Sequence, residues 1–315
     1  MSSVPAFEEP ASVRPRPGAR PLELVGSFQH DGHRLTYTEF GSGDQIVVLT
    51  HGIMFTRRMH APLARKLAAA GYRVVTLDLL GHGESDRPTE SWYYSMPAFA
   101  EQTIALLDHL GIDDAVIGGT SLGANVALEI AVTAPERVRG LVVEMPVLDN
   151  AIVAALLTFG PLLFAARFLP VTVRAVGAVA RLLPRGGQWL DALTETLDQR
   201  PASMAALLHG VFFGRIAPPK AVRTRIRVPA LVIGHQRDPI HPFGDADTLA
   251  VDLPDAEFVQ ARSPVELRFD PGRLTDAIID FVRRCYAADR HRQPGRSRSR
   301  QAGGYPPPPH RRRSS

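Results

Sequence analysis

Short apolar runs alternate with longer amphipathic segments along most of the chain. The apolar runs predict eight buried strands, at residues 24–29, 35–39, 46–50, 74–77, 115–117, 141–143, 230–233 and 257–259. Apolar residues at helical spacing predict helices at residues 59–70, 96–110, 122–134 and 273–286. The first two runs flank the turn signal Asp31-Gly32 and are expected to form an antiparallel hairpin. The alternation of strands and helices favours an α/β fold with a doubly wound, mostly parallel sheet.

One long interval interrupts this alternation. Residues 147–228 carry no strand signal and are helical and apolar, which predicts a helical lid inserted between two parts of the core, residues 22–146 and 229–288. Residues 150–166 contain no charge and approach the length of a membrane span. Because Gly160 and Pro161 interrupt this stretch and Pro170 follows it, a lid over an apolar pocket is the favoured interpretation.

Three arginines of the lid recur every seven residues, at Arg167, Arg174 and Arg181. This spacing would put them near one face of a helix, if Pro170 allows a single helix there. We expect that face to be the solvent side of an amphipathic lid helix, and contact with a membrane surface is the less favoured alternative.

The two ends of the chain have a different composition from its body. Residues 1–21 are rich in proline, and residues 289–315 are rich in arginine, serine and proline, so we expect both to be disordered. Residues 290–315 hold eight arginines and no acid, so the net charge of +4 leaves about −4 on residues 1–289. We therefore expect no nucleic-acid surface on the body. The basic tail could bind RNA, anionic lipid or a partner, but a solvated appendage is favoured.

Cysteine usage and the start of the chain bear on the compartment. Cys285 is the only cysteine, so no intrachain disulfide can form. The first residues lack the apolar core of a signal peptide, and we expect a cytoplasmic protein.

The candidate chemistry centres on the pentapeptide Gly-Thr-Ser-Leu-Gly at residues 119–123. It follows a predicted strand and precedes a predicted helix, which is the context that a nucleophile elbow requires. Glycines are needed there because the turn is crowded and has no room for side chains. Ser121 is therefore the candidate nucleophile.

Three further motifs stand in order around Ser121. They read Thr-His-Gly-Ile at residues 50–53, Asp-Leu-Leu-Gly-His-Gly-Glu-Ser-Asp at residues 78–86, and Gly-His-Gln-Arg-Asp-Pro-Ile-His-Pro at residues 234–242. Together these motifs resemble the lid-bearing branch of the α/β-hydrolase superfamily, over residues 24–287. The resemblance implies that Asp238 is the catalytic acid and that the N–H groups of Ile53 and Leu122 form an oxyanion hole.

Other residues compete for these roles. Glu144, at the end of its strand, is an alternative position for the acid, and Asp238 could instead pair with Arg237 or cap a turn. We expect His51 and His82 to pack within their loops and not to carry protons.

The catalytic histidine of this superfamily is not found at its expected position. It should fall within residues 263–267, which read Ser-Pro-Val-Glu-Leu. Glu266 could accept the proton, although a carboxylate is a poor base for an alcohol. A histidine from elsewhere could enter the site, such as His241 or His209 of the lid. His241 is three residues from Asp238 and is followed by Pro242, which favours a loop histidine over a relocated base. The third possibility is that catalysis has been lost.

Two functions follow from these observations. The first is a serine hydrolase that cleaves a small lipophilic ester, thioester or related carbonyl compound through an acyl-enzyme on Ser121. The alternative is a catalytically silent relative that binds an apolar ligand or a partner. A serine nucleophile argues against haloalkane dehalogenases and epoxide hydrolases, which attack with aspartate. We expect no cofactor and no metal, because no phosphate loop, dinucleotide fingerprint or metal-ligand spacing stands out. The oligomeric state stays open.

Overall fold

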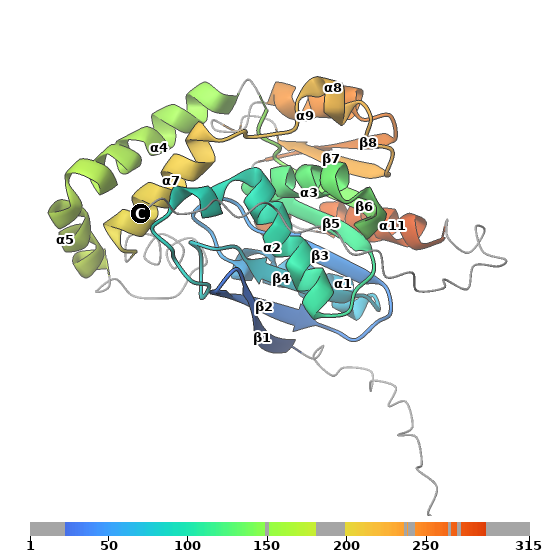
Figure 1. Ribbon diagram of the computed structural model, residues 1–315. Coiled ribbons are helices and arrows are strands. Elements are labelled where there is room, and N and C mark those ends of the chain that lie inside the picture. The colour runs from blue at the N-terminus through green and yellow to red at the C-terminus, as the bar shows by residue number, and fades with distance from the viewer. Residues whose placement is uncertain are drawn as a thin grey trace, which may run out of the picture.

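A mixed sheet with eight strands forms the centre of the molecule (Figure 1). The structure is a computed structural model and describes residues 23–148, 151–180, 199–235, 238, 243–263, 266–269 and 272–287. The strand order is β1-β2-β4-β3-β5-β6-β7-β8. The strands are β1 (Glu23–His30), β2 (His33–Phe40), β3 (Ile46–Thr50), β4 (Arg73–Asp78), β5 (Ala115–Thr120), β6 (Val138–Glu144), β7 (Ala230–His235) and β8 (Ala256–Ala261).

The direction of the strands confirms the predicted fold class. β1 pairs antiparallel with β2, and β2 with β4, whereas every other neighbouring pair is parallel. Asp31 and Gly32 have φ angles of 48° and 77°, so both central residues of the predicted hairpin turn have the positive φ of a type I′ turn. The fold is that of an α/β hydrolase.

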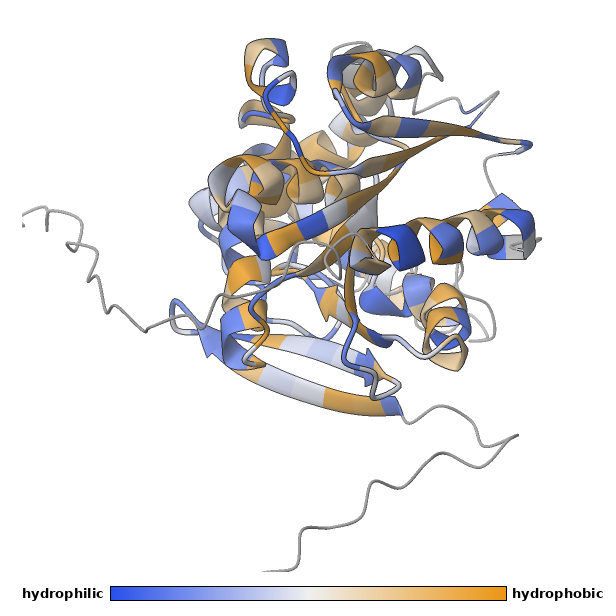
Figure 2. Ribbon diagram, turned by 90° about the vertical axis from the view of Figure 1, so that its right-hand side faces the viewer, coloured by the Kyte–Doolittle hydropathy of each residue, from blue (hydrophilic) through white to orange (hydrophobic). Residues whose placement is uncertain are grey.

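Helices cover both faces of the sheet. α1 (Ala61–Ala69) and α11 (Gly272–Ala287) pack against one face, and α2 (Met96–His109), α3 (Leu122–Thr133) and α9 (Phe243–Asp252) against the other. α11 shows why this arrangement forms, because its buried residues Leu274, Ile278, Phe281 and Cys285 recur at helical spacing. Hydrophobic and hydrophilic segments accordingly alternate along the helices that cover the sheet (Figure 2). Short helical turns complete these layers: η1 (Arg57–His60), η2 (Ser91–Tyr94), η3 (Pro135–Arg137) and α10 (Glu266–Phe269).

The structure extends seven of the eight strands beyond their predicted ends, β5 and β6 among them, and adds the helix α9. β5 continues from the predicted residues 115–117 through Gly118 and Gly119 to Thr120. Glycine carries no β-propensity, so the apolar pattern ended too early. β6 begins at Val138, and α9 was not among the predicted helices.

The segment between β6 and β7 is helical in its described residues, apart from short connections. It contains α4 (Ala151–Phe168), α5 (Pro170–Ala180), α7 (Pro201–Phe213) and α8 (Lys220–Arg223). The expectation that Pro161 interrupts the first helix is wrong, because α4 runs through it. Pro161 has no N–H group that could donate a hydrogen bond to the carbonyl of Leu157. Because Leu157 is exposed, water can donate to that carbonyl instead.

Pro170 does end the helical run. α5 begins at this proline, and the axes of α4 and α5 differ by 111°. Arg167 and Arg174 therefore lie on two helices and do not share one helix face, and Arg181 lies outside the described residues. No single helix in the described part of the chain is long and apolar enough to cross a membrane; α4 and α5 meet that test only together, as a bent pair.

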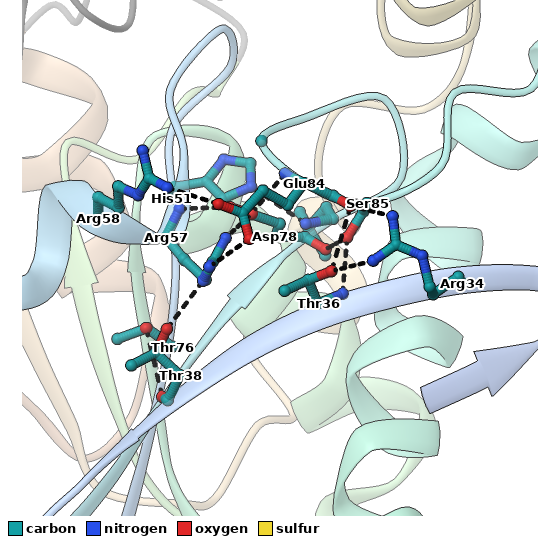
Figure 3. Close-up of polar contacts among 12 residues, drawn as sticks. Arg34, Thr36, Thr38, His51, Arg57, Arg58, Thr76, Asp78, Glu84 and Ser85 are labelled. Atoms are coloured by element: carbon teal, nitrogen blue, oxygen red, sulfur yellow. Dashed lines mark hydrogen bonds and ion pairs between the residues drawn. The ribbon is translucent and has the colours of Figure 1, made fainter. Parts of the chain in front are cut away.

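A buried ionic network holds the loops that follow β3 and β4 together (Figure 3). The Asp78 carboxylate, at the end of β4, pairs with the guanidinium of Arg57 and accepts hydrogen bonds from the N–H of Arg57 at 2.6 Å and of Glu84 at 2.9 Å. The Arg57 side chain also donates to Thr38 and to the Glu84 carboxylate. Gly83 has φ 49°, and a Cβ there would lie 2.0 Å from Asp78 Oδ2. This contact explains the second glycine of the motif at residues 78–86.

Replacing Arg57 should destabilise the fold strongly. The Arg57→Met variant leaves the fully buried Asp78 carboxylate without its partner, and we expect the free energy of unfolding to fall by about 3–5 kcal/mol. Arg58 pairs with the same Glu84 but is 59% exposed, so Arg58→Met should cost less than about 1 kcal/mol. Urea denaturation of both variants measures the difference, and equal effects would contradict the role assigned to Arg57.

Candidate functional site

Ser121 sits in a strained turn between β5 and α3. Its backbone angles are φ 55° and ψ −109°, a conformation that costs a non-glycine residue about 1–3 kcal/mol. Two backbone hydrogen bonds hold it there: Ser121 N–H donates to the carbonyl of Glu144 at 2.9 Å, and Asn125 N–H donates to the carbonyl of Ser121 at 3.1 Å. The backbone geometry is that of a nucleophile elbow.

The two glycines beside Ser121 are required by close backbone contacts. A Cβ on Gly119 would lie 2.5 Å from the Thr50 carbonyl oxygen, and a Cβ on Gly123 would lie 2.1 Å from the same atom. The Gly123 N–H also donates to the His51 carbonyl at 3.1 Å. The start of α3 therefore rests directly on the end of β3, and no side chain fits between them.

The predicted oxyanion-hole residues lie beside Ser121. Ile53, Leu122 and Ser121 line one cavity. Among the described residues, the N–H groups of Ile53 and Leu122 have no hydrogen-bond acceptor. Leu122 begins α3, so its N–H is one of the donors that a helix leaves unpaired in its first turn. Both groups are thus available to a developing negative charge.

The cavity at Ser121 is small and mostly apolar. Its volume is about 40 Å³, close to that of a single water molecule in the liquid (about 30 Å³). The side-chain amide of Asn125, the second polar residue of the lining, is already occupied by the carbonyls of Val147 and Ile216. Ala155 and Phe159 of α4 belong to the cavity wall. Among the described residues, the lining is Ile53, Met96, Ser121, Leu122, Asn125, Val147, Ala155, Phe159, Val211, Phe212 and Ile216.

Asp238 lies three residues beyond the end of β7 and is partly exposed. It does not line the cavity at Ser121. The structure thus brings Ser121, Ile53 and Leu122 together, whereas the catalytic role of Asp238 stays a prediction.

The buried histidines near Ser121 are tied into loops. His51 Nδ1 lies 2.9 Å from the Gly52 carbonyl, so it carries the proton, and its Nε2 accepts from the N–H of Leu79 at 3.1 Å. His82 packs against the ring of His51, with ring centroids 4.5 Å apart. His60 Nε2 lies 2.9 Å from the carbonyl oxygen of Thr50. Burial lowers the pKa of all three side chains, that of His60 to about 3, so they are neutral at physiological pH.

Arginine stands close to where the catalytic histidine was expected. Arg268 of α10 follows directly after the window of residues 263–267, and its guanidinium donates to Thr120 Oγ1 at 2.9 Å and to Glu144 Oε2 at 2.6 Å. Glu266, the carboxylate considered as a base, is buried and pairs with Arg273 at 2.8 Å. It also accepts a hydrogen bond from the N–H of Arg262. These contacts give Glu266 a structural role.

Glu144 is the centre of a buried cluster that includes Thr120, His235 and Arg268, here termed the Glu144 cluster. His235 Nε2 lies 3.2 Å from Glu144 Oε1, and His235 Nδ1 lies 2.7 Å from the carbonyl of Ser263. The alternative acid position is thus occupied by charge partners. Glu144 and Thr120 are neighbours in register on β6 and β5, so the cluster lies next to the nucleophile elbow.

The pKa values of the cluster follow from these contacts. Burial alone would raise the pKa of Glu144, but the charge of Arg268 and the contacts with His235 and Thr120 hold it well below its usual range. Burial alone would lower the pKa of His235, but Glu144 and the Ser263 carbonyl outweigh this effect and raise it. The cluster is therefore a charged network under the active-site turn.

The sequence interpretation gave no role to His235 or Arg268. Both positions carried a usable signal, because one ends a strand at the carboxyl edge of the sheet and the other follows the last strand. His209, considered as a base, stacks on Phe213 with ring centroids 4.7 Å apart and lines a separate hollow between α4, α5 and α7. His241 lies outside the described residues. Within the described residues, no group of three or more acidic, histidine or cysteine side chains could hold a metal ion.

The fold and the site together define a class of protein. It has an open α/β sheet, and its candidate site lies at the carboxyl edge of the parallel strands. Residues 45–262 match the family model of the alpha/beta hydrolase fold. This match covers more than half of the chain, so the chain belongs to the α/β hydrolase family. Its family and the hydrolases among its relatives identify it as a hydrolase.

The similar proteins differ in their named activities, so they do not identify a substrate for this chain. An uncharacterized protein of Mycobacterium tuberculosis is 26% identical over 94% of this chain and 92% of its own length. Bifunctional epoxide hydrolase 2 of Sus scrofa is 37% identical, over 35% of this chain and 20% of that protein. The crystal structure of the enol-lactonase from Burkholderia xenovorans LB400 superposes with a TM-score of 0.66 at 20% identity, over 82% of this chain and 100% of the lactonase. At this identity, the similarity to the lactonase structure shows the fold alone.

Replacing His235 should change how stability depends on pH. The folded-state pKa of His235 is raised, so its stabilising contribution is complete below its unfolded pKa of about 6.5 and is lost as the pH rises through the folded value. The stability difference between the parent protein and His235→Gln should therefore shrink as the pH rises from about 6 to about 9. Urea denaturation across that range measures it. His33→Gln, which removes a histidine of the β1–β2 hairpin, is the control, and a difference that grows with pH would contradict this assignment.

Proposed function

We propose that this hydrolase cleaves a small lipophilic ester, thioester or related carbonyl compound through an acyl-enzyme on Ser121. One observation carries the proposal: Ser121, in an elbow conformation, shares an apolar cavity with Ile53 and Leu122, whose N–H groups have no acceptor among the described residues. A nucleophile and two oxyanion donors beside one apolar space are the parts that acyl transfer needs.

The reaction proceeds in two similar steps. Ser121 Oγ attacks the carbonyl carbon and gives its proton to a base, while the new oxyanion accepts hydrogen bonds from Ile53 and Leu122. Collapse of this intermediate breaks the bond to the alcohol or thiol, which leaves with that proton. Water then attacks the acyl-enzyme in the same way and releases the acid and Ser121. Each oxyanion donor contributes about 10²- to 10³-fold in rate.

We assign the general base to His241, oriented by Asp238. The support is by elimination. The described histidines near Ser121 contact backbone carbonyls or, in the case of His235, also the Glu144 carboxylate, and His209 lines a different hollow. Arginine stays protonated at physiological pH, so Arg268 cannot accept the proton of Ser121. His241 follows Asp238 by three residues in the sequence.

The lipophilic character of the substrate is inferred from the cavity wall. Met96, Phe159, Val211 and Phe212 surround Ser121, and the one amide in the wall is already hydrogen-bonded. Charged or strongly polar groups of a substrate would lose their hydration there without finding partners. Small apolar acyl groups fit this lining best.

Active-site labelling tests the proposal. Purified protein is treated with a fluorophosphonate probe and assayed with short p-nitrophenyl esters, and the labelled residue is identified by mass spectrometry. We expect labelling at Ser121, no labelling or turnover in Ser121→Ala, and unchanged behaviour in Ser27→Ala, which removes an exposed serine of β1. His241→Ala should lower kcat by about 10²- to 10⁴-fold, and His209→Ala should not.

Each outcome of this experiment decides a separate point. Turnover that survives Ser121→Ala would contradict the nucleophile, and full activity in His241→Ala would contradict the base. A folded protein that neither labels nor turns over would favour the silent, ligand-binding alternative. The position of Arg268 beside the expected histidine window is the observation that supports that alternative.

A further inference from the structure

The bent pair α4–α5, here termed the helical arm (residues 151–180), exposes an unusual amount of apolar surface. Eight of the fourteen large hydrophobic side chains that are exposed in the described structure belong to these thirty residues. Leu157 is 74% exposed and Val171 is 76% exposed. Large exposed apolar patches mark surfaces that bind something.

The arm has one packed side and one open side. Ala166 and Val173 are buried with Met204 and Leu208 of α7, which fixes the arm to the rest of the segment. The open side carries Leu157, Phe164, Phe168, Val171, Val176 and Val179. The arm projects at one end of the molecule, away from β1 and α11 (Figure 1). Phe164 and Phe168 also border a hollow whose other wall includes residues of α7.

The charges on the arm all have one sign. Arg167 and Arg174 are its only charged residues, and both are exposed. Both also line a hollow of about 790 Å³ together with Leu163, Phe164 and Phe168. The Arg167 guanidinium lies 5.7 Å from the ring centroid of Phe168, so apolar and basic groups are adjacent. Apolar side chains beside arginines are typical of helices that lie in the interface of an anionic bilayer.

We propose that the open side of the arm binds the surface of an anionic lipid bilayer. The apolar side chains enter the boundary between headgroups and acyl chains, while Arg167 and Arg174 pair with lipid phosphates. Neither helix crosses the bilayer, because neither is long and apolar enough alone and the pair is bent by 111°. Binding of this kind does not depend on the chemistry at Ser121.

A second copy of the chain is a poorer partner for this surface. A two-fold dimer sets the same patch against itself, so Arg167 and Arg174 of both copies would meet. The arm contains no acidic residue that could neutralise them. Lipid phosphates supply the missing negative charge.

Site-specific labelling tests where the protein meets the bilayer. Cys285 is the only cysteine and is buried, so an introduced cysteine can be labelled selectively. Full-length Val171→Cys and Val251→Cys, carrying a polarity-sensitive dye, are mixed with vesicles of phosphatidylcholine and phosphatidylglycerol. Val251 is 79% exposed on α9 and serves as the matched control. We expect a blue shift of the dye at residue 171 and none at residue 251.

Vesicle co-sedimentation then measures the contribution of each kind of residue. The double variant Leu157→Asp, Val171→Asp should lower partitioning at least about 10-fold. The double variant Arg167→Gln, Arg174→Gln should lower it about 5-fold per arginine on anionic vesicles, and the effect should shrink on phosphatidylcholine alone. Arg225→Gln, Arg227→Gln removes two exposed arginines before β7 and is the control for charge.

Three results would overturn the proposal. Unchanged partitioning of both arm variants would assign any binding to the arginine-rich tail, which all variants retain. No binding of the parent protein to either vesicle would leave the arm without this partner. A dimer in sedimentation equilibrium that Leu157→Asp, Val171→Asp dissolves would assign the surface to a second copy. Ser121→Ala should bind vesicles like the parent protein, so failure of the proposed hydrolysis would not imitate any of these results.

Discussion

The rest of the site depends on the contact between the start of α3 and the end of β3. Gly119 and Gly123 let these backbones meet at the Thr50 carbonyl, where any Cβ would clash. This approach forces Ser121 into a positive φ, and the hydrogen bond from its N–H to Glu144 keeps it there. The strain is stable because it is imposed from several sides at once, by β3, β6 and α3. It also leaves the N–H of Leu122, beside Ser121, without an acceptor in the part of the chain that the structure describes.

Two buried ionic clusters join the loops at the carboxyl edge of the sheet. Arg57 and Asp78 join the loops after β3 and β4, and Glu144, His235 and Arg268 join the ends of β6 and β7 to α10. Buried ion pairs add little net stability compared with apolar packing, but losing one partner is costly. Such pairs favour one arrangement of loops over others, which suits a site whose donors must stay in place.

Arg268 distinguishes this chain from the arrangement that its family resemblance implied. The residue beside the expected histidine window pairs with Glu144 and contacts Thr120, the residue before Ser121. The loop after β8 therefore stabilises the elbow through a fixed positive charge. The proposed proton transfer is accordingly assigned to the motif after β7, whose sequence contains both an acid and a histidine.

The amino-acid sequence by itself determined the layered sheet, the hairpin and the position of Ser121. These features depend on local chemistry: apolar runs form strands, Asp31-Gly32 permits the turn, and glycines flank the elbow because nothing larger fits. The true end of β5 was missed because Gly118 and Gly119 have low β-propensity. They occupy the strand because neighbouring atoms leave no room for a larger residue. The path of α4 through Pro161 was missed because solvent, and not sequence, decides whether an unpaired carbonyl is tolerated.

Only the tertiary structure decided which charges meet and which apolar surface stays open. Glu144, His235 and Arg268 are far apart in the sequence, and nothing in their local context indicates that they share one buried space. The outer face of the helical arm was likewise hidden, because an apolar helix looks the same whether its neighbours cover it or not. Local patterns specify elements through their own backbone preferences, whereas partners and exposure arise only when distant segments occupy the same space.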